Sequence, residues 1–176
     1  MKLHLGCGKR FIPGFYHIDA LPYPHVDKVG SVDDLKGINS ESINLIYACH
    51  VLEHFPRNSA KQVIKEWHRV LKRDSILRIA VPDFEAICSV YLKNHNIEEI
   101  IGPVCGKQDH EHNFHYVIYD FDSLSSLLKT CGFREVNRYD WRNTEHSEVD
   151  DFSQAYIPHM NKTSGTLISL NVEAIK

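Results

Sequence analysis

The sequence has no long hydrophobic run, no basic patch and no paired cysteines, and each absence excludes a class of protein. No apolar stretch among the 176 residues approaches the roughly 18 that a membrane-spanning helix needs, so no membrane span is expected. The 20 lysines and arginines are outnumbered by 23 acidic residues and form no cluster, so nucleic acid is not an expected partner. The five cysteines are odd in number and include no Cys-x-x-Cys pair, which is typical of reduced thiols in a cytoplasm. The chain starts directly with a strand-like segment, so neither a signal peptide nor a transit peptide is expected.

The composition that remains is globular. Hydrophobic residues make up 43% and charged residues 24% of the chain, a balance that argues against disorder. The length suits one compact domain over residues 1–176. The sequence leaves the oligomeric state open.

Short apolar strands alternate with longer helical stretches. Strands are predicted at residues 2–5, 16–18, 26–32, 43–48, 76–81, 133–139 and 166–174. Helices are predicted up to Leu71 with Asn58 or Ser59 as N-cap, after Asp83, and from about Asp122 with Gly132 as C-cap. This alternation predicts an α/β fold with a mostly parallel sheet, in which ligands bind beyond the carboxyl ends of the strands.

Two glycines follow the first predicted strand immediately. Gly6 and Gly8, on either side of Cys7, let the backbone turn sharply and approach a ligand that any Cβ atom would push away. The full Gly-x-Gly-x-x-Gly pattern of a dinucleotide site is absent, because Arg10 and Phe11 follow. The turn therefore argues against NAD or FAD.

Asp19 ends the second predicted strand, 13 residues after Gly6. A carboxylate in that place can accept hydrogen bonds from both hydroxyls of a ribose. The structural alternative is a turn aspartate ahead of Leu21 and Pro22. On the functional interpretation, the glycine turn and Asp19 converge on one nucleoside.

Four strings of the chain resemble a known family: LHLGCGKRFIPGFYHIDA, YACHVLEHF, EWHRVLKRDSILRIAVPDFEAI and NFHYVIYDFDSLSSLLKTCGF. They resemble class I S-adenosylmethionine (SAM)-dependent methyltransferases of the methyltransferase type 11 kind, especially a short subgroup of bacterial surface-polysaccharide gene clusters. The resemblance covers nearly the whole chain. It implies a Rossmann-like three-layer sandwich, with a mostly parallel seven-stranded sheet whose last strand is antiparallel. It also implies methyl transfer from SAM to a small polar acceptor, with S-adenosylhomocysteine as product.

The resemblance assigns the cofactor residues. Gly6, Cys7 and Gly8 would pass under the methionine and ribose parts of SAM, and Asp19 would hold the ribose. His50, just past the fourth strand, would lie near the methionine end.

The residue that contacts the adenine stays open between several candidates. Spacing to Leu35 points to Ser31, whereas side-chain chemistry favours Asp33 or Asp34. Backbone N–H groups near Val32 can serve the ring in either case.

Three side chains are candidates for the chemistry. A hydroxyl acceptor must lose its proton during methyl transfer, and histidine suits a general base because its ordinary pKa is about 6.5. His115 is expected in a segment that folds over the cofactor mouth; the alternative is a capping or packing histidine. His54 follows His50 by four residues, so on a helical turn the two share one face, and a packed structural role is again the alternative. Asp83 ends the fifth strand, where it can bind acceptor hydroxyls or cap the next helix.

Two further groups of polar residues stand out. His110, Glu111, His112 and His115 offer ordinary Zn²⁺ ligands, but their spacing matches no metal-binding motif, and no metal is assigned. Residues 141–164 form an insertion with polar aromatic side chains, interpreted as an acceptor-binding lid. These side chains are Trp141, Arg142, His146, Tyr156 and His159.

The sequence therefore predicts a cytoplasmic SAM-dependent methyltransferase of polysaccharide biosynthesis that acts on a sugar or nucleotide-sugar hydroxyl. The sugar follows from the resemblance alone. Two rival hypotheses are a SAM-binding protein without chemistry that assists a glycosyltransferase, and a nicotinamide-dependent oxidoreductase on a similar fold.

Overall fold

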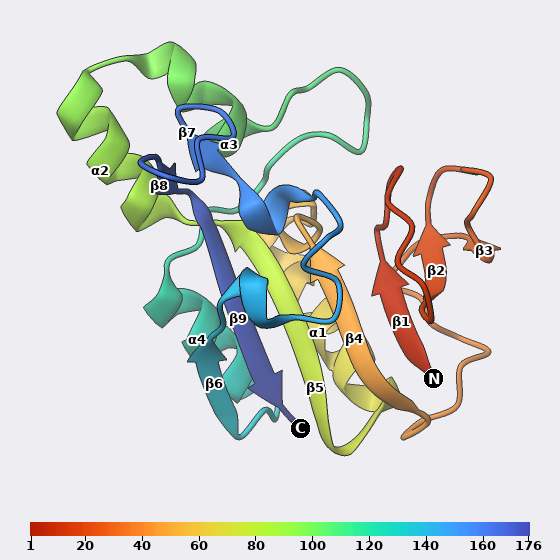
Figure 1. Ribbon diagram of the computed structural model, residues 1–176. Coiled ribbons are helices and arrows are strands. Elements are labelled where there is room, and N and C mark those ends of the chain that lie inside the picture. The colour runs from red at the N-terminus through yellow and green to blue at the C-terminus, as the bar shows by residue number, and fades with distance from the viewer.

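The computed structural model describes residues 1–176 and is built on a seven-stranded sheet of order β3-β2-β1-β4-β5-β9-β6 (Figure 1). Neighbouring strands run parallel, except that β9 pairs antiparallel with both β5 and β6. The strands of the sheet are β1 (Lys2–Leu5), β2 (Tyr16–Asp19), β3 (Lys28–Val29), β4 (Ile43–Cys49), β5 (Leu71–Pro82), β6 (Glu135–Arg138) and β9 (Ser169–Ile175). The predicted α/β fold with an antiparallel last strand is confirmed.

The helices are not spread evenly around the sheet. Helices α1 (Arg57–Val70) and α4 (Phe121–Thr130) cover one face, behind the sheet in Figure 1. Helices α2 (Phe84–Asn94) and α3 (Ile101–Cys105) lie beyond the carboxyl ends of the central strands (Figure 1). None of the helices has the length and apolar character that crossing a membrane requires.

Alternating side chains of the central strands build the main core. On β4, Ile46 and Ala48 point to the face that α1 covers, where they share a core of 28 buried residues with Trp67. Leu45 and Tyr47 point to the opposite face and are buried there as well. Burial on both faces explains why β4 reads as a continuous apolar run.

Irregular chain with two short 3₁₀ turns (Trp141–Asn143 and Phe152–Gln154), rather than an α-helix, covers the opposite face of the sheet. Residues 139–155, in front of the sheet in Figure 1, lie over β4 and β5. The Tyr47 hydroxyl donates to Asp151 Oδ2 (2.6 Å), and Arg78 Nη1 donates to Glu145 Oε2 (2.6 Å). Because both bonds involve a charged group, and the Tyr47–Asp151 bond is buried, they attach the segment to the sheet.

Some predicted strands have different bounds in the structure. The strand expected at residues 26–32 is reduced to the two residues of β3. The strand expected at residues 166–174 is divided between β8 (Thr166–Leu167) and β9, because Ile168 N–H donates to Ala155 O (2.9 Å) of the insertion. β8 forms a hairpin with β7 (Tyr156–Ile157), which the sequence did not predict.

The predicted helices differ less from the structure than the predicted strands do. Helix α1 begins at Arg57 behind Pro56, with no side-chain cap, so neither Asn58 nor Ser59 is the N-cap. Proline suits this end of a helix because its φ angle is already restricted. The other two predicted helices are present as α2 and α4.

Candidate active site

The glycine bend and Asp19 meet at the carboxyl ends of β1 and β2. Gly8 N–H donates to Asp19 Oδ2 (2.7 Å), and Leu21 N–H donates to Asp19 Oδ1 (2.8 Å). Gly6 N–H donates to Ile18 O (2.8 Å) and fixes the start of the bend. The two features that the sequence placed on one nucleoside are therefore direct neighbours.

The bend has the shape that a bound cofactor needs. Gly6 and Gly8 have φ angles of 62° and 53°, in the left-handed region that favours glycine. A Cβ atom on Gly6 would lie 2.5 Å from Val51 Cγ2, whereas one on Gly8 would meet nothing within 4 Å. Gly6 is thus required for packing against the β4 side, and the space over Gly8 is open to a ligand. These residues fit a nucleoside cofactor.

Cys7, between the two glycines, is a poor nucleophile. Burial, followed by the nearby charge of Asp19, raises the pKa of its thiol to about 12. Its Sγ atom lies 3.7 Å from His25 Nε2. Cys7 contributes its backbone to the bend and keeps its thiol protonated at neutral pH.

The candidate residues for contact with the adenine have different surroundings in the structure. Ser31 Oγ donates to Asp33. Trp67 Nε1–H donates to the carbonyl oxygen of Val32 (2.8 Å) and fixes this residue. The Val32 N–H makes no hydrogen bond within the chain. Asp34 instead binds the backbone N–H and the Nζ of Lys36 (both 3.1 Å), in a surface groove beside α1. Asp33 lines the same groove as Asp34, so both acidic candidates lie there.

A cavity of about 550 Å³ opens beyond the carboxyl ends of β4 and β5. His50 and His54 line it from the β4 side, and His115 lines it from the segment after α3. The other walls come from α3 and from residues 150–160 of the insertion. With His159 of the insertion, four of the twelve histidines thus line one cavity.

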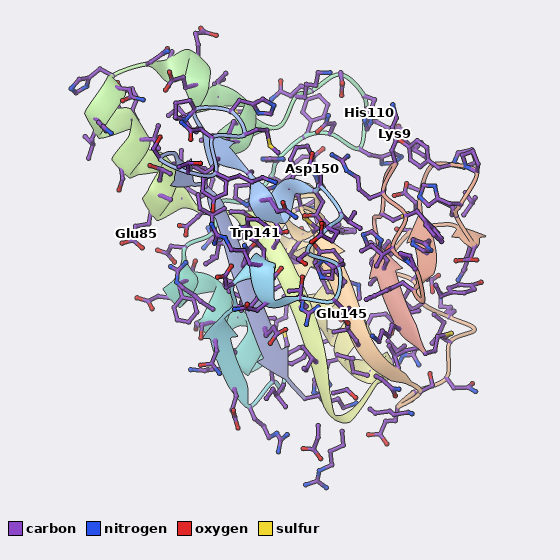
Figure 2. The ribbon with its side chains drawn as sticks, in the orientation of Figure 1. Lys9, Glu85, His110, Trp141, Glu145 and Asp150 are labelled. Carbon is purple, nitrogen blue, oxygen red and sulfur yellow. The ribbon has the colours of Figure 1, made fainter.

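The glycine bend reaches this cavity through Arg10. Its Nε–H donates to Asp150 O (3.1 Å), and its guanidinium lies over the Phe152 ring at 5.2 Å. The Phe152 ring in turn lies 5.4 Å from the ring of His50. In Figure 2, Lys9 marks the bend and Asp150 the insertion. The cofactor bend and the cavity are therefore adjacent parts of one site.

His50 begins the loop after β4 in a left-handed conformation, with a φ angle of 53°. Its Nδ1 lies 3.2 Å from Glu53 Oε1, and its Nε2 lies 3.1 Å from Ser169 Oγ. An unfavourable backbone conformation in a non-glycine residue is typical of functional sites. These contacts fix the imidazole at the rim of the cavity.

His54 and His115 have the same arrangement of ring nitrogens. His54 Nδ1 lies 3.1 Å from Phe114 O, and His115 Nδ1 lies 2.9 Å from Pro103 O. A carbonyl oxygen only accepts, so each Nδ1 carries the hydrogen and each neutral ring keeps its lone pair on Nε2. The two rings are 4.8 Å apart, edge to face. Burial lowers the pKa of His115, which keeps it neutral and able to accept a proton at pH 7.

Glu53, which the sequence analysis missed, is fully buried behind these histidines. Neither carboxylate oxygen has a hydrogen-bond partner. Burial by itself would raise the pKa of Glu53, but the closeness of His50 and, to a smaller extent, His54 lowers it below its ordinary value. The sequence signal was present as a glutamate between two histidines in HVLEH.

Asp83 has a structural position. Its Oδ1 accepts from Ala86 N–H (3.3 Å) as the N-cap of α2, and its Oδ2 accepts from Arg138 Nη1 (3.1 Å). It does not line the cavity. Of its two predicted roles, the geometry corresponds to helix capping.

The remaining polar clusters are divided as well. His110, labelled in Figure 2, and His112 are exposed beside Asp109 and Glu111, and neither is grouped with His115. Within the insertion, residues 150–160 line the cavity. Of the five insertion residues named from the sequence, Tyr156 and His159 line it, whereas Trp141, Arg142 and His146 do not.

Comparison with known proteins agrees with this geometry. Residues 19–79, from the end of β2 to β5, match the family model described as a methyltransferase domain. The match and the fold together support a SAM-dependent methyltransferase. They also support SAM as its cofactor. No curated protein sequence matches the chain.

Solved methyltransferase structures share the fold over 99% of this chain. A SAM-dependent methyltransferase of Archaeoglobus fulgidus has 15% sequence identity, a TM-score of 0.62 and 85% of its own chain covered. One of Thermotoga maritima, described as a possible histamine N-methyltransferase, has 16% identity, a TM-score of 0.60 and 81% covered. The 1,6-didemethyltoxoflavin-N1-methyltransferase of Burkholderia thailandensis, solved with its substrate and S-adenosylhomocysteine, has 14% identity, a TM-score of 0.59 and 70% covered.

Proposed function

We propose that this chain transfers the methyl group of SAM to a hydroxyl of a sugar or nucleotide sugar in the cavity beyond β4 and β5. The observation that carries the proposal is the contact between Gly8 and Asp19, which forms an open nucleoside cradle next to a cavity lined by imidazoles. A role in polysaccharide biosynthesis rests on the sequence resemblance. The five cysteines are free thiols, which supports a cytoplasmic location.

The cofactor cradle is proposed to involve backbone more than side chains. Gly6, Cys7 and Gly8 lie under the methionine and ribose, and Asp19, with lone pairs to spare, accepts from the ribose hydroxyls. The adenine is proposed to meet the Val32 N–H, which makes no hydrogen bond within the chain, with Ser31 beside it. His50 stands at the methionine end. SAM, when bound there, supplies the methyl group from a sulfonium centre.

The acceptor is proposed to bind between the histidines and the insertion. Tyr156, His159 and Asn113 line the cavity and combine hydrogen-bonding groups with ring faces, a combination that suits a sugar. The neutral His115 takes the proton of the acceptor hydroxyl on Nε2, while its bond to Pro103 O holds the ring in place. His54 packs against it and offers a second lone pair.

Cofactor binding tests the first half of the proposal. Calorimetry with S-adenosylhomocysteine should show one site, and Asp19→Asn should weaken binding by roughly 10-fold or more, because the ribose loses charge-assisted hydrogen bonds. Asp122→Asn removes an exposed carboxylate of α4 and is the matched control, with unchanged affinity expected. Binding of NAD without binding of S-adenosylhomocysteine would refute the assignment and favour an oxidoreductase.

Turnover tests the second half. Purified protein with SAM and a panel of nucleotide sugars should release S-adenosylhomocysteine, and His115→Asn should lower kcat by about 100-fold or more, the usual share of a general base. Asparagine can still donate to Pro103 O, so cofactor affinity should persist. His110→Asn, on the exposed loop, should leave kcat unchanged. Cofactor binding without turnover of any acceptor would favour the non-catalytic partner of a glycosyltransferase.

A further inference from the structure

We infer that Glu53, His54 and His115 form a binding site for a divalent transition-metal ion at the inner wall of the cavity. One possible ligand atom of each residue lies within 4.8 Å of those of the other two. The inference goes beyond methyl transfer, because a cation can be bound and measured there without cofactor or acceptor. In the metal-bound protein the Nε2 lone pair of His115 is occupied, so His115 acts as the proposed base only while the site is free of metal.

The first argument is the condition of Glu53. Its side chain is 0% exposed, and both of its oxygens lack a hydrogen-bond donor. A buried carboxylate without hydrogen bonds is costly and rare in proteins. His50 Nδ1 forms an ion pair with Oε1 at 3.2 Å but leaves Oε2 without a polar partner. A bound cation would satisfy the carboxylate directly.

The second argument is the orientation of the two imidazoles. Both rings donate Nδ1–H to a backbone carbonyl, His54 to Phe114 O and His115 to Pro103 O. Metal-binding histidines almost always donate their second ring nitrogen in this way, because the bond fixes the tautomer and the ring plane. Each ring therefore presents a prepared Nε2 lone pair. Neither ring needs to change its tautomer in order to bind a metal.

The donor set indicates which metal fits. Two imidazole nitrogens and one carboxylate suit Zn²⁺ and its transition-metal neighbours, whereas Mg²⁺ and Ca²⁺ prefer oxygen ligands alone. Three protein ligands leave a coordination position free. Because His54 and His115 line the cavity while Glu53 lies behind them, that free position faces the cavity. A hydroxyl or phosphate oxygen of an acceptor can occupy it, with His50 as an outer neighbour of Glu53.

A Zn²⁺ titration of chelator-treated full-length protein tests the inference. Calorimetry should show one ion bound with a Kd below about 10 μM, and Zn²⁺ should raise the Tm by mass action. Glu53→Gln, which keeps the size of the side chain, should raise the Kd by about 100-fold or more, because changes to groups that only orient ligands already cost roughly 10- to 100-fold. His54→Asn and His115→Asn should have similar effects. Co²⁺ should give visible absorption bands in the wild type and lose them in each variant.

Two controls decide the outcome. Glu99→Gln changes another carboxylate that lines the cavity, and the double variant His110→Asn/His112→Asn removes the exposed loop imidazoles; both should bind Zn²⁺ as the wild type does. Absence of tight binding in the wild type would overturn the inference. So would binding that survives in Glu53→Gln and His115→Asn but disappears in the loop variant. A protein that binds S-adenosylhomocysteine but does not bind Zn²⁺ would rule out this metal site and leave the proposed function standing.

Discussion

His4 on β1 should make the protein unusually sensitive to mild acid. Its side chain is 2% exposed and lies between the sheet and residues 139–155, the irregular segment that covers it. Burial, followed by His17, His146, His25 and Arg10, lowers its pKa from 6.5 to about 3. Its Nδ1 has no hydrogen-bond partner to stabilise a charge.

The sign follows from the two states of the chain. Below pH 6.5 the unfolded chain binds a proton at His4, whereas the folded chain does so only near pH 3. Folding stability is therefore fully present above the ordinary pKa and is lost as the pH falls toward the folded value. At pH 5, about 1.5 units below the ordinary value, the loss from His4 alone is about 2 kcal/mol, at about 1.4 kcal/mol per unit. Burial also lowers the pKa of His17 and of His146, so both add in the same direction.

Urea unfolding at about pH 7.5 and about pH 5 measures this loss. His4→Phe keeps an aromatic ring against Tyr47 (5.2 Å between rings in the native protein) but cannot bind a proton. The free energy of unfolding should fall by about 2 kcal/mol less in His4→Phe than in the wild type over this interval. His95→Asn removes an exposed histidine at the end of α2 and should behave as the wild type. An equal loss in His4→Phe and the wild type would refute the argument that His4 stays neutral in the folded chain.

Three further substitutions test the local structure by urea unfolding at neutral pH. Gly6→Ala should lower the free energy of unfolding by about 2 kcal/mol or more, since its φ angle is 62° and its Cβ would lie 2.5 Å from Val51 Cγ2; a neutral effect would contradict the rigid bend. Trp67→Phe should cost about 1–3 kcal/mol, because the buried carbonyl of Val32 loses its donor, and it should also weaken binding of S-adenosylhomocysteine. Asp120→Ala should cost about 1 kcal/mol through loss of the capping box of α4, without a change in cofactor affinity.

The sheet and the bend could be predicted because local patterns determine them. A strand buried on both faces needs apolar residues throughout, so β4 and β5 are visible in the sequence. The contact of Gly8 with Asp19 follows from topology, since the carboxyl ends of neighbouring parallel strands lie at one edge. The strand predicted at residues 26–32 was too long, because the pairing of β3 involves only Ile18–Lys28 and Asp19–Val29.

The interior of the candidate site could not be predicted in the same way. His54 and His115 are 61 positions apart, and only the path of the chain after α3 brings their rings to 4.8 Å. Glu53 was overlooked because a charged residue in a short helical turn is normally exposed. Asp83 had two equally reasonable roles in sequence, and the choice depended on Arg138, a partner from β6.

Residues 139–155, the irregular segment that covers the sheet, contribute both to folding stability and to a wall of the cavity. Asp151 of the insertion is buried against the sheet, where it accepts from Tyr47, and it lines the cavity together with its neighbours Asp150 and Phe152. A helix satisfies its own backbone hydrogen bonds internally, whereas this irregular segment is attached to the sheet through hydrogen bonds of side chains. Changes that loosen the attachment therefore also move a wall of the cavity. The glycine bend at β1 and β2 is held by Gly8 and Asp19 and meets the cover through Arg10 and Asp150, so changes in the cover away from Asp150 should leave the proposed nucleoside site intact.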